Sequence, residues 1–322
     1  MLCATASEMW CGNLYNHPVR SPHLLALVAM LCWGLAYVPS EWLAQSLGPF
    51  GAAACRLGVG GLALFALMLG RRQPLAPGVP LLTVVWLGLA QTALFYGATF
   101  WGIVHEGAGL ASVLANSDPL FVAVLAVAFL GERLSGRQRI GLVFGFVGVA
   151  SAVCSGGLWP PKPTLAAGIV VVGALAWAVG TIVAAGALRN TSHPISLAAW
   201  QMTVGAVFLA VISPFGGHGH ASSGARDLSL VLLLGVIGSA VPTALFYYAL
   251  RAGAASEISA WFFLVPIIGV ASAWPLLGEG LTLPLGVGLL GVSVGLWLVL
   301  RQRQRLVGSA PVMPTRQPPE LP

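Results

Sequence analysis

The stretch Thr92-Ala93-Leu94-Phe95-Tyr96 occurs a second time as Thr243-Ala244-Leu245-Phe246-Tyr247, 151 residues further along the chain. Both copies lie within apolar runs, and an alanine follows two residues after each of them (Ala98 and Ala249). Five identical residues in matching surroundings indicate an internal duplication. Such a duplication determines how the whole chain is organised.

The two halves of the chain match at further positions around these copies. The offset drifts by a few residues, as changes in loop length would produce, and the matches keep their order along the chain. The matched pairs are Leu31 with Leu175, Trp33 with Trp177, Gly60 with Gly205, Pro119 with Pro266, and Gly131-Glu132 with Gly278-Glu279. We therefore predict two repeats, residues 22–156 and 164–300, between an N-terminal arm (1–21) and a basic, then disordered tail (301–322).

The composition places these repeats in a membrane. Hydrophobic residues make up 57% of the chain and charged residues 7%, with a mean hydropathy of +0.89, whereas a soluble domain carries about 25% charged residues. An apolar run of about 20 residues can cross the hydrocarbon core of a bilayer. Ten such runs predict helices over residues 22–40, 49–69, 79–103, 107–130, 138–156, 164–187, 194–216, 228–250, 252–275 and 281–300.

The basic residues predict the orientation of these helices. With the N-terminus inside, twelve arginines fall in cytoplasmic segments, whereas the outer loops hold only Lys162 and Arg226. This bias predicts that both termini are cytoplasmic. We expect a multi-pass protein of the cell membrane, the inner membrane in bacteria. The net charge of +6 reflects the same bias and does not indicate a nucleic-acid partner.

Because each repeat holds five helices, the second repeat must enter the membrane from the opposite side. The predicted fold is therefore all-α, with ten transmembrane helices arranged as two inverted five-helix repeats. Secondary transporters use this arrangement for alternating access, because each half can adopt the conformation of the other. Tyr96 and Tyr247 are then expected at mirrored depths, facing one central cavity.

Several motifs resemble those of one transporter family. They are Leu31-Cys32-Trp33-Gly34, Arg56, Ala111-Ser112 leading to Pro119, Leu130-Gly131-Glu132-Arg133-Leu134, Pro266, and Leu277-Gly278-Glu279. Over residues 22–300 the chain resembles an EamA-type member of the drug/metabolite transporter superfamily. The resemblance implies ten helices around a central cavity and the transport of small metabolites such as amino acids, sugars or nucleotide derivatives. Asp118 departs from the family, in which small or apolar residues are more usual there.

Asp118 is the strongest candidate for a functional ionisable group. It lies near the middle of the fourth predicted helix, the depth at which a carboxylate is most costly. Pro119 removes a backbone hydrogen bond beside it and opens the helix locally. Asp118 could bind a substrate amine or couple transport to protons; alternatively, it is a protonated or hydrogen-bonded residue that serves helix packing.

Arg56 is the one basic residue predicted within a span, towards its outer side. It could neutralise Asp118 or bind a substrate carboxylate; alternatively it is structural, or its head reaches the outer headgroups. Its repeat mate is Gln201, which keeps hydrogen bonding without the charge. Both are predicted substrate-binding residues.

The glutamates have weaker claims. Glu257 could couple transport to protons, or be an interfacial acid whose head reaches the cytoplasmic surface. Glu132 and Glu279 close their helices at membrane corners, and we predict structural roles for them, capping the following helix or pairing with arginine. Pro119 and Pro266 are likewise predicted to be structural.

Six aromatic residues complete the predicted substrate site. Aromatic side chains inside spans serve packing or interfacial belts as well as cavities, so these residues remain candidates with that alternative open. They are Trp33, Tyr37, Tyr96, Trp177, Tyr247 and Trp261. Gly141-x-x-x-Gly145 and Gly291-x-x-x-Gly295 predict close helix packing.

The predicted function is secondary active transport of a small metabolite such as an amino acid, with export as the predicted direction. The alternative is an integral-membrane enzyme acting on a lipid-linked substrate, but its acids would have to cluster at one membrane face. The acids of this chain are scattered, and no phosphate-binding loop or metal-ligand motif occurs in it. We expect no cofactor, no metal and no catalytic residue, a small-molecule substrate and the lipid bilayer as partners, and a monomer or homodimer.

The predicted topology can be tested with reporter fusions. Fusions after Arg72, Arg139 and Arg305 should all report a cytoplasmic location, and a fusion near Lys162 an external one, because arginines concentrate on the inner side. An external result at Arg305 would contradict both the topology and the inverted repeat.

Overall fold

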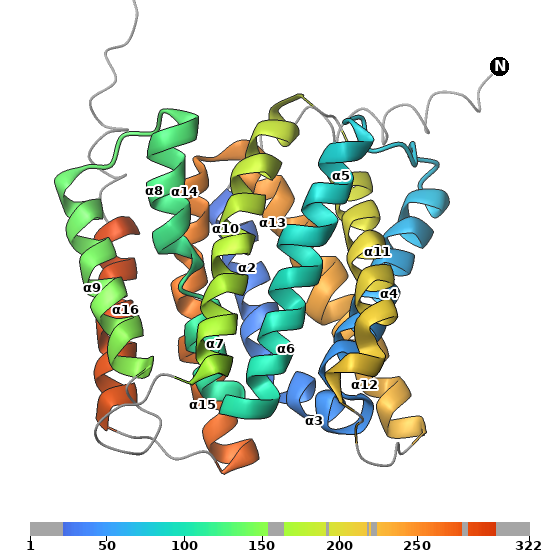
Figure 1. The fold of residues 1–322 in the computed structure, drawn as a ribbon. Helices are drawn as coiled ribbons and strands as arrows, with labels where there is room; N and C mark the ends of the chain where they lie inside the picture. Colours follow the sequence, from blue (N-terminus) through green and yellow to red (C-terminus); the bar gives the residue numbers. More distant parts are fainter. Residues whose placement is uncertain are drawn as a thin grey trace, which may run out of the picture.

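The computed structural model describes residues 22–153, 164–190, 193–217, 219, 224–278 and 283–300. Throughout these residues the chain forms helices joined by loops. Helices suit the apolar runs because each helix pairs its backbone N–H and C=O groups within itself, which hydrocarbon surroundings require. Figure 1 shows one bundle of roughly parallel helices, with the loop between α8 and α9 at the upper end and α3 and α12 at the lower end.

Three of the predicted spans in the first half are interrupted. The first bends by 41° at Ala36 and continues to Leu47 rather than ending at residue 40. The third contains a π-helical segment, and the fourth breaks at Asn116 and Ser117. The elements are α2 (Pro22–Leu35), α3 (Tyr37–Leu47), α4 (Pro49–Gly70), α5 (Leu81–Leu87), η1 (Gly88–Leu94), α6 (Phe95–Glu106), α7 (Ala108–Ala115), α8 (Asp118–Leu130) and α9 (Gly136–Val153).

The second half has interruptions of the same kinds at corresponding places. A π-helical segment divides α12 from α13, and a 3-10 turn divides α14 from α15 just before Pro266, as the earlier break precedes Pro119. The elements are α10 (Leu165–Asn190), α11 (Pro194–Ile212), η2 (Ser213–Gly216), α12 (Ala225–Gly235), η3 (Val236–Ala240), α13 (Val241–Ala252), α14 (Ala255–Ser259), η4 (Ala260–Phe263), α15 (Leu264–Leu277) and α16 (Leu283–Leu300). The straight α10 differs from the bent α2–α3 pair.

Helix ends repeat this correspondence. Gly131 follows α8 with φ 68° and ψ 21°, and Gly278 follows α15 with φ 70° and ψ 19°. Both lie in the left-handed region, in which glycine avoids the steric cost of a side chain. The two Gly-Glu corners of the sequence therefore begin with the same backbone turn.

The contacts between helices also come in matched pairs. The most extensive contacts join α9 to α16, side by side at one edge of Figure 1, and α4 to α11. The contact of α6 with α10 has its counterpart in α2 with α13, and that of α8 with α10 in α2 with α15. Exchanging the two halves of the chain therefore carries one set of contacts onto the other.

The lengths and surfaces of the helices are those of an integral multi-pass membrane protein. Within the described residues, seven helical segments are long and apolar enough to cross a membrane, and the bent α2–α3 pair brings the number to eight. Large apolar side chains face outward, among them Leu62 (69% exposed) and Phe129 (73%), as contact with lipid requires. The helices α9 and α16 are not among the eight, so ten spans remain a prediction.

Small residues bring α9 and α16 into backbone contact, as the glycine spacing predicts. A methyl group added at Gly295 would lie 2.6 Å from the carbonyl oxygen of Gly141, and one at Gly291 would lie 2.9 Å from Cα of Gly148. No side chain fits at these positions without a shift of the backbone. The prediction of close packing at the two glycine motifs is confirmed.

This contact predicts different effects for two alanine substitutions in α16. Gly295→Ala should destabilise the protein by about 1–3 kcal/mol, because the backbones must separate. Gly286→Ala meets no atom within 4 Å and should be neutral or slightly stabilising, since alanine favours helix. Thermal unfolding in detergent micelles measures both, and equal midpoints for the two variants would contradict the packing.

Candidate functional site

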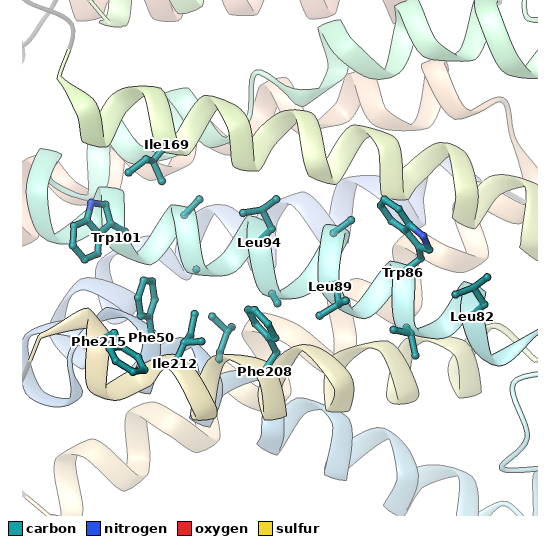
Figure 2. A pocket seen from close by; sticks show the side chains of 16 residues that line it. Phe50, Leu82, Trp86, Leu89, Leu94, Trp101, Ile169, Phe208, Ile212 and Phe215 are labelled. Carbon is teal, nitrogen blue, oxygen red and sulfur yellow. The ribbon is translucent and has the colours of Figure 1, made fainter.

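A large cavity on the described chain, about 910 Å³, is an apolar groove. Sixteen residues line it, from Leu82 near one end to Trp101 and Phe215 near the other (Figure 2). Several of them face outward, including Trp86 (56% exposed) and Phe215 (82%). In a membrane this surface meets lipid chains, and the indole N–H groups of Trp86 and Trp101 are the only hydrogen-bonding side-chain groups among its described lining residues.

A much smaller cavity lies among polar and aromatic side chains inside the bundle. The space open to the centre of a water molecule is about 30 Å³, which is enough for about one water. The lining residues are Trp33, Tyr37, Arg56, Phe95, Tyr96, Thr99, Asn116, Trp177, Phe262 and Val265. Five predicted substrate-site residues therefore come together here, from α2, α3, α4, α6 and α10. We call this the central cavity.

Among the described residues, Arg56 is the only charged one that lines the central cavity. Its Nε donates to Ser239 Oγ (2.7 Å), Nη1 to Ser40 Oγ (2.9 Å) and Nη2 to the carbonyl oxygen of Gly238 (2.5 Å). The guanidinium carbon also lies 5.0 Å from the centre of the Tyr96 ring, at cation–π distance. These partners are neutral, and the described residues give Arg56 no ion pair with Asp118.

Trp33 and Trp177, which the sequence repeat relates, contact each other at the centre of the bundle. Their ring centroids lie 5.6 Å apart at an interplanar angle of 90°, a favourable edge-to-face arrangement. Trp33 also stacks on Phe262 (5.2 Å), and Trp177 packs on Phe95 (4.6 Å). One tryptophan from each half therefore forms the core of an aromatic cluster beside Arg56.

Tyr247 belongs to a second polar cluster next to the central cavity and is not among the residues that line it. Its hydroxyl lies 2.8 Å from Oε1 of Gln91 and 2.6 Å from Oε1 of Gln201. Gln91 Nε2 in turn donates to Thr181 Oγ1 (3.1 Å). The Tyr247 hydroxyl has one hydrogen and can donate to only one of these two oxygens. If the Gln201 amide is turned by 180°, its NH2 group faces the hydroxyl and donates the second hydrogen bond.

The two polar clusters consist of corresponding residues. The sequence repeat relates Arg56 to Gln201 and Tyr96 to Tyr247, and each of these pairs divides between the Arg56 cluster and the Tyr247 cluster. The first cluster carries a charge and borders the central cavity, whereas the second is neutral and closed by its own hydrogen bonds. The prediction that Tyr96 and Tyr247 face one cavity therefore holds for Tyr96 alone.

Asp118 lies at the start of α8, 1% exposed. Neither carboxyl oxygen has a hydrogen-bond partner in the described part of the chain, and Tyr37 lies within electrostatic range. Asp118 does not itself line the central cavity, although Asn116 and Val265 do. Val265 is its repeat mate at the offset that relates Pro119 to Pro266.

The remaining predicted residues lie elsewhere. Trp261 is partly buried and donates from Nε1 to Nδ1 of His23 (3.1 Å), at the start of α2. Glu257 is in the first turn of α14, and Pro119 and Pro266 lie in the first turns of α8 and α15, just after the two helix breaks. Glu279 lies outside the described residues.

Glu132 caps a helix of the other half of the chain. Its Oε1 accepts from the backbone N–H of Ala255 (2.8 Å), and its Oε2 from the N–H (3.2 Å) and hydroxyl of Ser256, at the start of α14. The helix that follows Glu132, α9, is instead preceded by Ser135, whose Oγ accepts from the N–H of Gln138 (3.2 Å).

Six residues of these clusters were not predicted from the sequence: Ser40, Gln91, Thr99, Asn116, Thr181 and Ser239. All are buried and polar. None is charged or part of a motif, so only the general cost of burying a polar group in an apolar run could have drawn attention to them.

Comparison with known proteins shows which family the chain matches. The description "EamA-like transporter family" matches residues 20–154 and again residues 164–301. An uncharacterized transporter of Bacillus subtilis, YvbV, is 28% identical over 87% of this chain and 91% of its own length. A protein of Streptantibioticus cattleyicolor named "Probable terminal-alkyne amino-acid exporter" is 28% identical over 88% of this chain and 93% of its own length.

Two further comparisons concern a plant protein and the fold. The WAT1-related chloroplastic protein At3g02690 of Arabidopsis thaliana is 29% identical over 83% of this chain, which spans 66% of that protein's length. A solved crystal structure, 16% identical in sequence, superimposes with a TM-score of 0.69 over 89% of this chain and 98% of the other. At that identity the similarity shows the fold alone.

The Tyr247 cluster generates a stability prediction. Tyr247→Phe removes the hydroxyl shared by Gln91 and Gln201 and should cost about 1–3 kcal/mol of unfolding free energy, because buried amide groups lose a partner. Tyr37→Phe should cost less, since the Asn116 amide that donates to Tyr37 (3.0 Å) also donates to the Ser112 carbonyl (2.6 Å). Chemical unfolding of both variants measures the difference; the reverse order would contradict the network.

Proposed function

Since the chain belongs to the EamA-like transporter family, we propose that it is a secondary active transporter that exports a small metabolite by alternating access. Membership of this family makes it a multi-pass membrane transporter and not an enzyme. The finer proposal comprises ten spans, two inverted five-helix repeats, cytoplasmic termini and, in bacteria, an inner-membrane location.

The matched features of the two halves support the inverted repeat. Helix breaks before Pro119 and Pro266, the turns at Gly131 and Gly278, and the π-helical segments η1 and η3 recur at corresponding places. Inter-helix contacts recur in exchanged pairs as well. In an alternating-access cycle the halves would exchange conformations around the central cavity.

The proposal rests mainly on two ionisable residues that are buried inside the bundle and do not form an ion pair with each other. Arg56 is 5% exposed and Asp118 1% exposed, and neither has an ion-pair partner in the described residues. Charged side chains at this depth are costly and tend to mark substrate or proton pathways. Helix packing alone would be served better by apolar residues of similar volume.

We propose a zwitterion such as an amino acid as the substrate. Arg56 would attract the carboxylate and Asp118 the amine, or Asp118 would carry a coupled proton, while the aromatic cluster would contact the apolar part. The name of the Streptantibioticus relative, an amino-acid exporter, agrees with this class and with the outward direction.

The surroundings of Asp118 favour a role for its own ionisation. The elements packed against α8 are α9, α10, α14 and η4. Their charged residues, Arg137 and Arg139 of α9, Arg189 of α10 and Glu257 of α14, lie in the end turns of their helices, and η4 has none. Within the described part of the chain, Tyr37 of α3 is a further titratable group within electrostatic range of Asp118.

Asp118→Asn tests the role of this carboxyl. The variant should fold and reach the membrane like the wild type, because the amide is nearly isosteric, but transport should be lost or should no longer depend on pH. Uptake of radiolabelled amino acids into proteoliposomes at several pH values measures this.

Asp227→Asn is the matched control, because Asp227 lies in the first turn of α12, away from the α7–α8 break. It should keep the wild-type pH profile. Full activity of Asp118→Asn with an unchanged profile would rule out the proposed role, and a loss of folded protein without a change in specific activity would assign Asp118 to packing.

A further inference from the structure

Three hydrogen-bonding groups on residues that line the central cavity have no partner in the described chain. They are Nε1 of Trp33, Nε1 of Trp177 and Oγ1 of Thr99. The residues are 6%, 2% and 5% exposed. The Tyr96 hydroxyl lies near the Trp33 indole N–H, close enough for a weak polar contact, but the pair does not meet hydrogen-bond geometry. Buried groups of this kind are ordinarily paired, and each one that is not requires an explanation.

An indole N–H can only donate, so two of these three groups call for an acceptor. The charge of the cavity indicates which kind of acceptor fits. Arg56 is the only charged residue in the described lining, and its described partners are two hydroxyls and a carbonyl. An anion with oxygen acceptors would satisfy the indoles and the charge together.

We propose that the central cavity binds the carboxylate of the substrate between the indole N–H groups of Trp33 and Trp177, with Thr99 as a third donor and Arg56 as the compensating charge. This inference rests on the proposed transport function and narrows it. The paired tryptophans donate the hydrogen bonds that recognise the carboxylate, and the positive charge of Arg56 makes the cavity favour an anion.

The repeat gives this donor set a property that a single arginine lacks. Trp33 and Trp177 are repeat mates in contact across the two halves, and a carboxylate has two equivalent oxygens. When the halves exchange conformations, each tryptophan takes the position of the other. The pair of N–H donors is therefore available in both states, so the substrate can stay bound while access changes sides.

The described conformation has room for about one water molecule in the cavity. A metabolite therefore enters only when the aromatic lining separates. In the closed state a water can accept from the indoles, which makes water alone a competing occupant that the experiment must exclude.

The experiment compares carboxylates with their neutral amides. The full chain in lipid nanodiscs is titrated with propionate, 4-methylpentanoate and 3-phenylpropionate, and with the three corresponding primary amides, at constant ionic strength. Thermal unfolding reports binding. At least one carboxylate should raise the unfolding midpoint and bind at least about tenfold more tightly than its amide. If no carboxylate exceeds its amide, only water occupies the donors and the proposal is overturned.

Substitutions that each remove one donor then test which residues bind the carboxylate. Trp33→Phe, Trp177→Phe and Thr99→Val should each weaken carboxylate binding by about tenfold, the loss of one charge-assisted hydrogen bond. The matched controls are Trp200→Phe, which loses an indole bond to the Leu75 carbonyl (2.8 Å), and Thr92→Val, which loses a hydroxyl bond to the Leu87 carbonyl (3.4 Å). Both controls should bind like the wild type. Equal weakening in variants and controls would contradict the assignment.

The outcome can be separated from that of the proposed function. If amino acids are not transported in proteoliposomes but carboxylates still bind better than amides, the amino-acid substrate fails and the carboxylate site stands. If transport occurs and the wild type does not distinguish carboxylates from amides, the site fails and transport stands. The comparison on the wild type remains decisive even where a tryptophan variant does not fold.

Discussion

In a bilayer, every backbone polar group must find its partner within the protein, and this requirement determines where helices can be interrupted. The break between α7 and α8 shows how the requirement is met. Asn116 Nδ2 donates to the Ser112 carbonyl (2.6 Å), and Ser117 Oγ to the Leu114 carbonyl (2.8 Å), so side chains bond to carbonyls near the end of α7. Both residues are buried inside the bundle. Irregular backbone is thereby confined to the interior, which is also where Asp118 and the central cavity lie.

Much of this arrangement could be predicted from the sequence, because it depends on local chemistry. Pro119 and Pro266 predict interruptions, since proline cannot donate a backbone hydrogen bond, and the glycine spacing of α9 and α16 predicts their close approach. The sequence repeat alone relates Trp33 to Trp177. These features need only a residue type and a position.

Other features depend on which helices become neighbours, and no local pattern reveals them. The bend of 41° at Ala36 is not one of them, because Pro39 lacks the N–H that would bond to the Leu35 carbonyl, which is a local cause of a kink. Glu132 was predicted to cap the following helix or to pair with an arginine, whereas its partners, Ala255 and Ser256, lie more than 120 residues away. Similarly, Gln91 and Thr181 are single polar residues in apolar runs, and only the fold brings them to Tyr247.

The Glu132 cap has a consequence for the populations of different conformations. It joins the end of α8 in the first half to the start of α14 in the second, so any motion that separates these helix ends must break it. The contact is only partly buried, and water would replace the lost bonds, which leaves a net cost of about 1–3 kcal/mol. A bias of that size favours the joined state by roughly 5- to 150-fold. It is small enough for the binding of a ligand at the centre of the bundle to reverse.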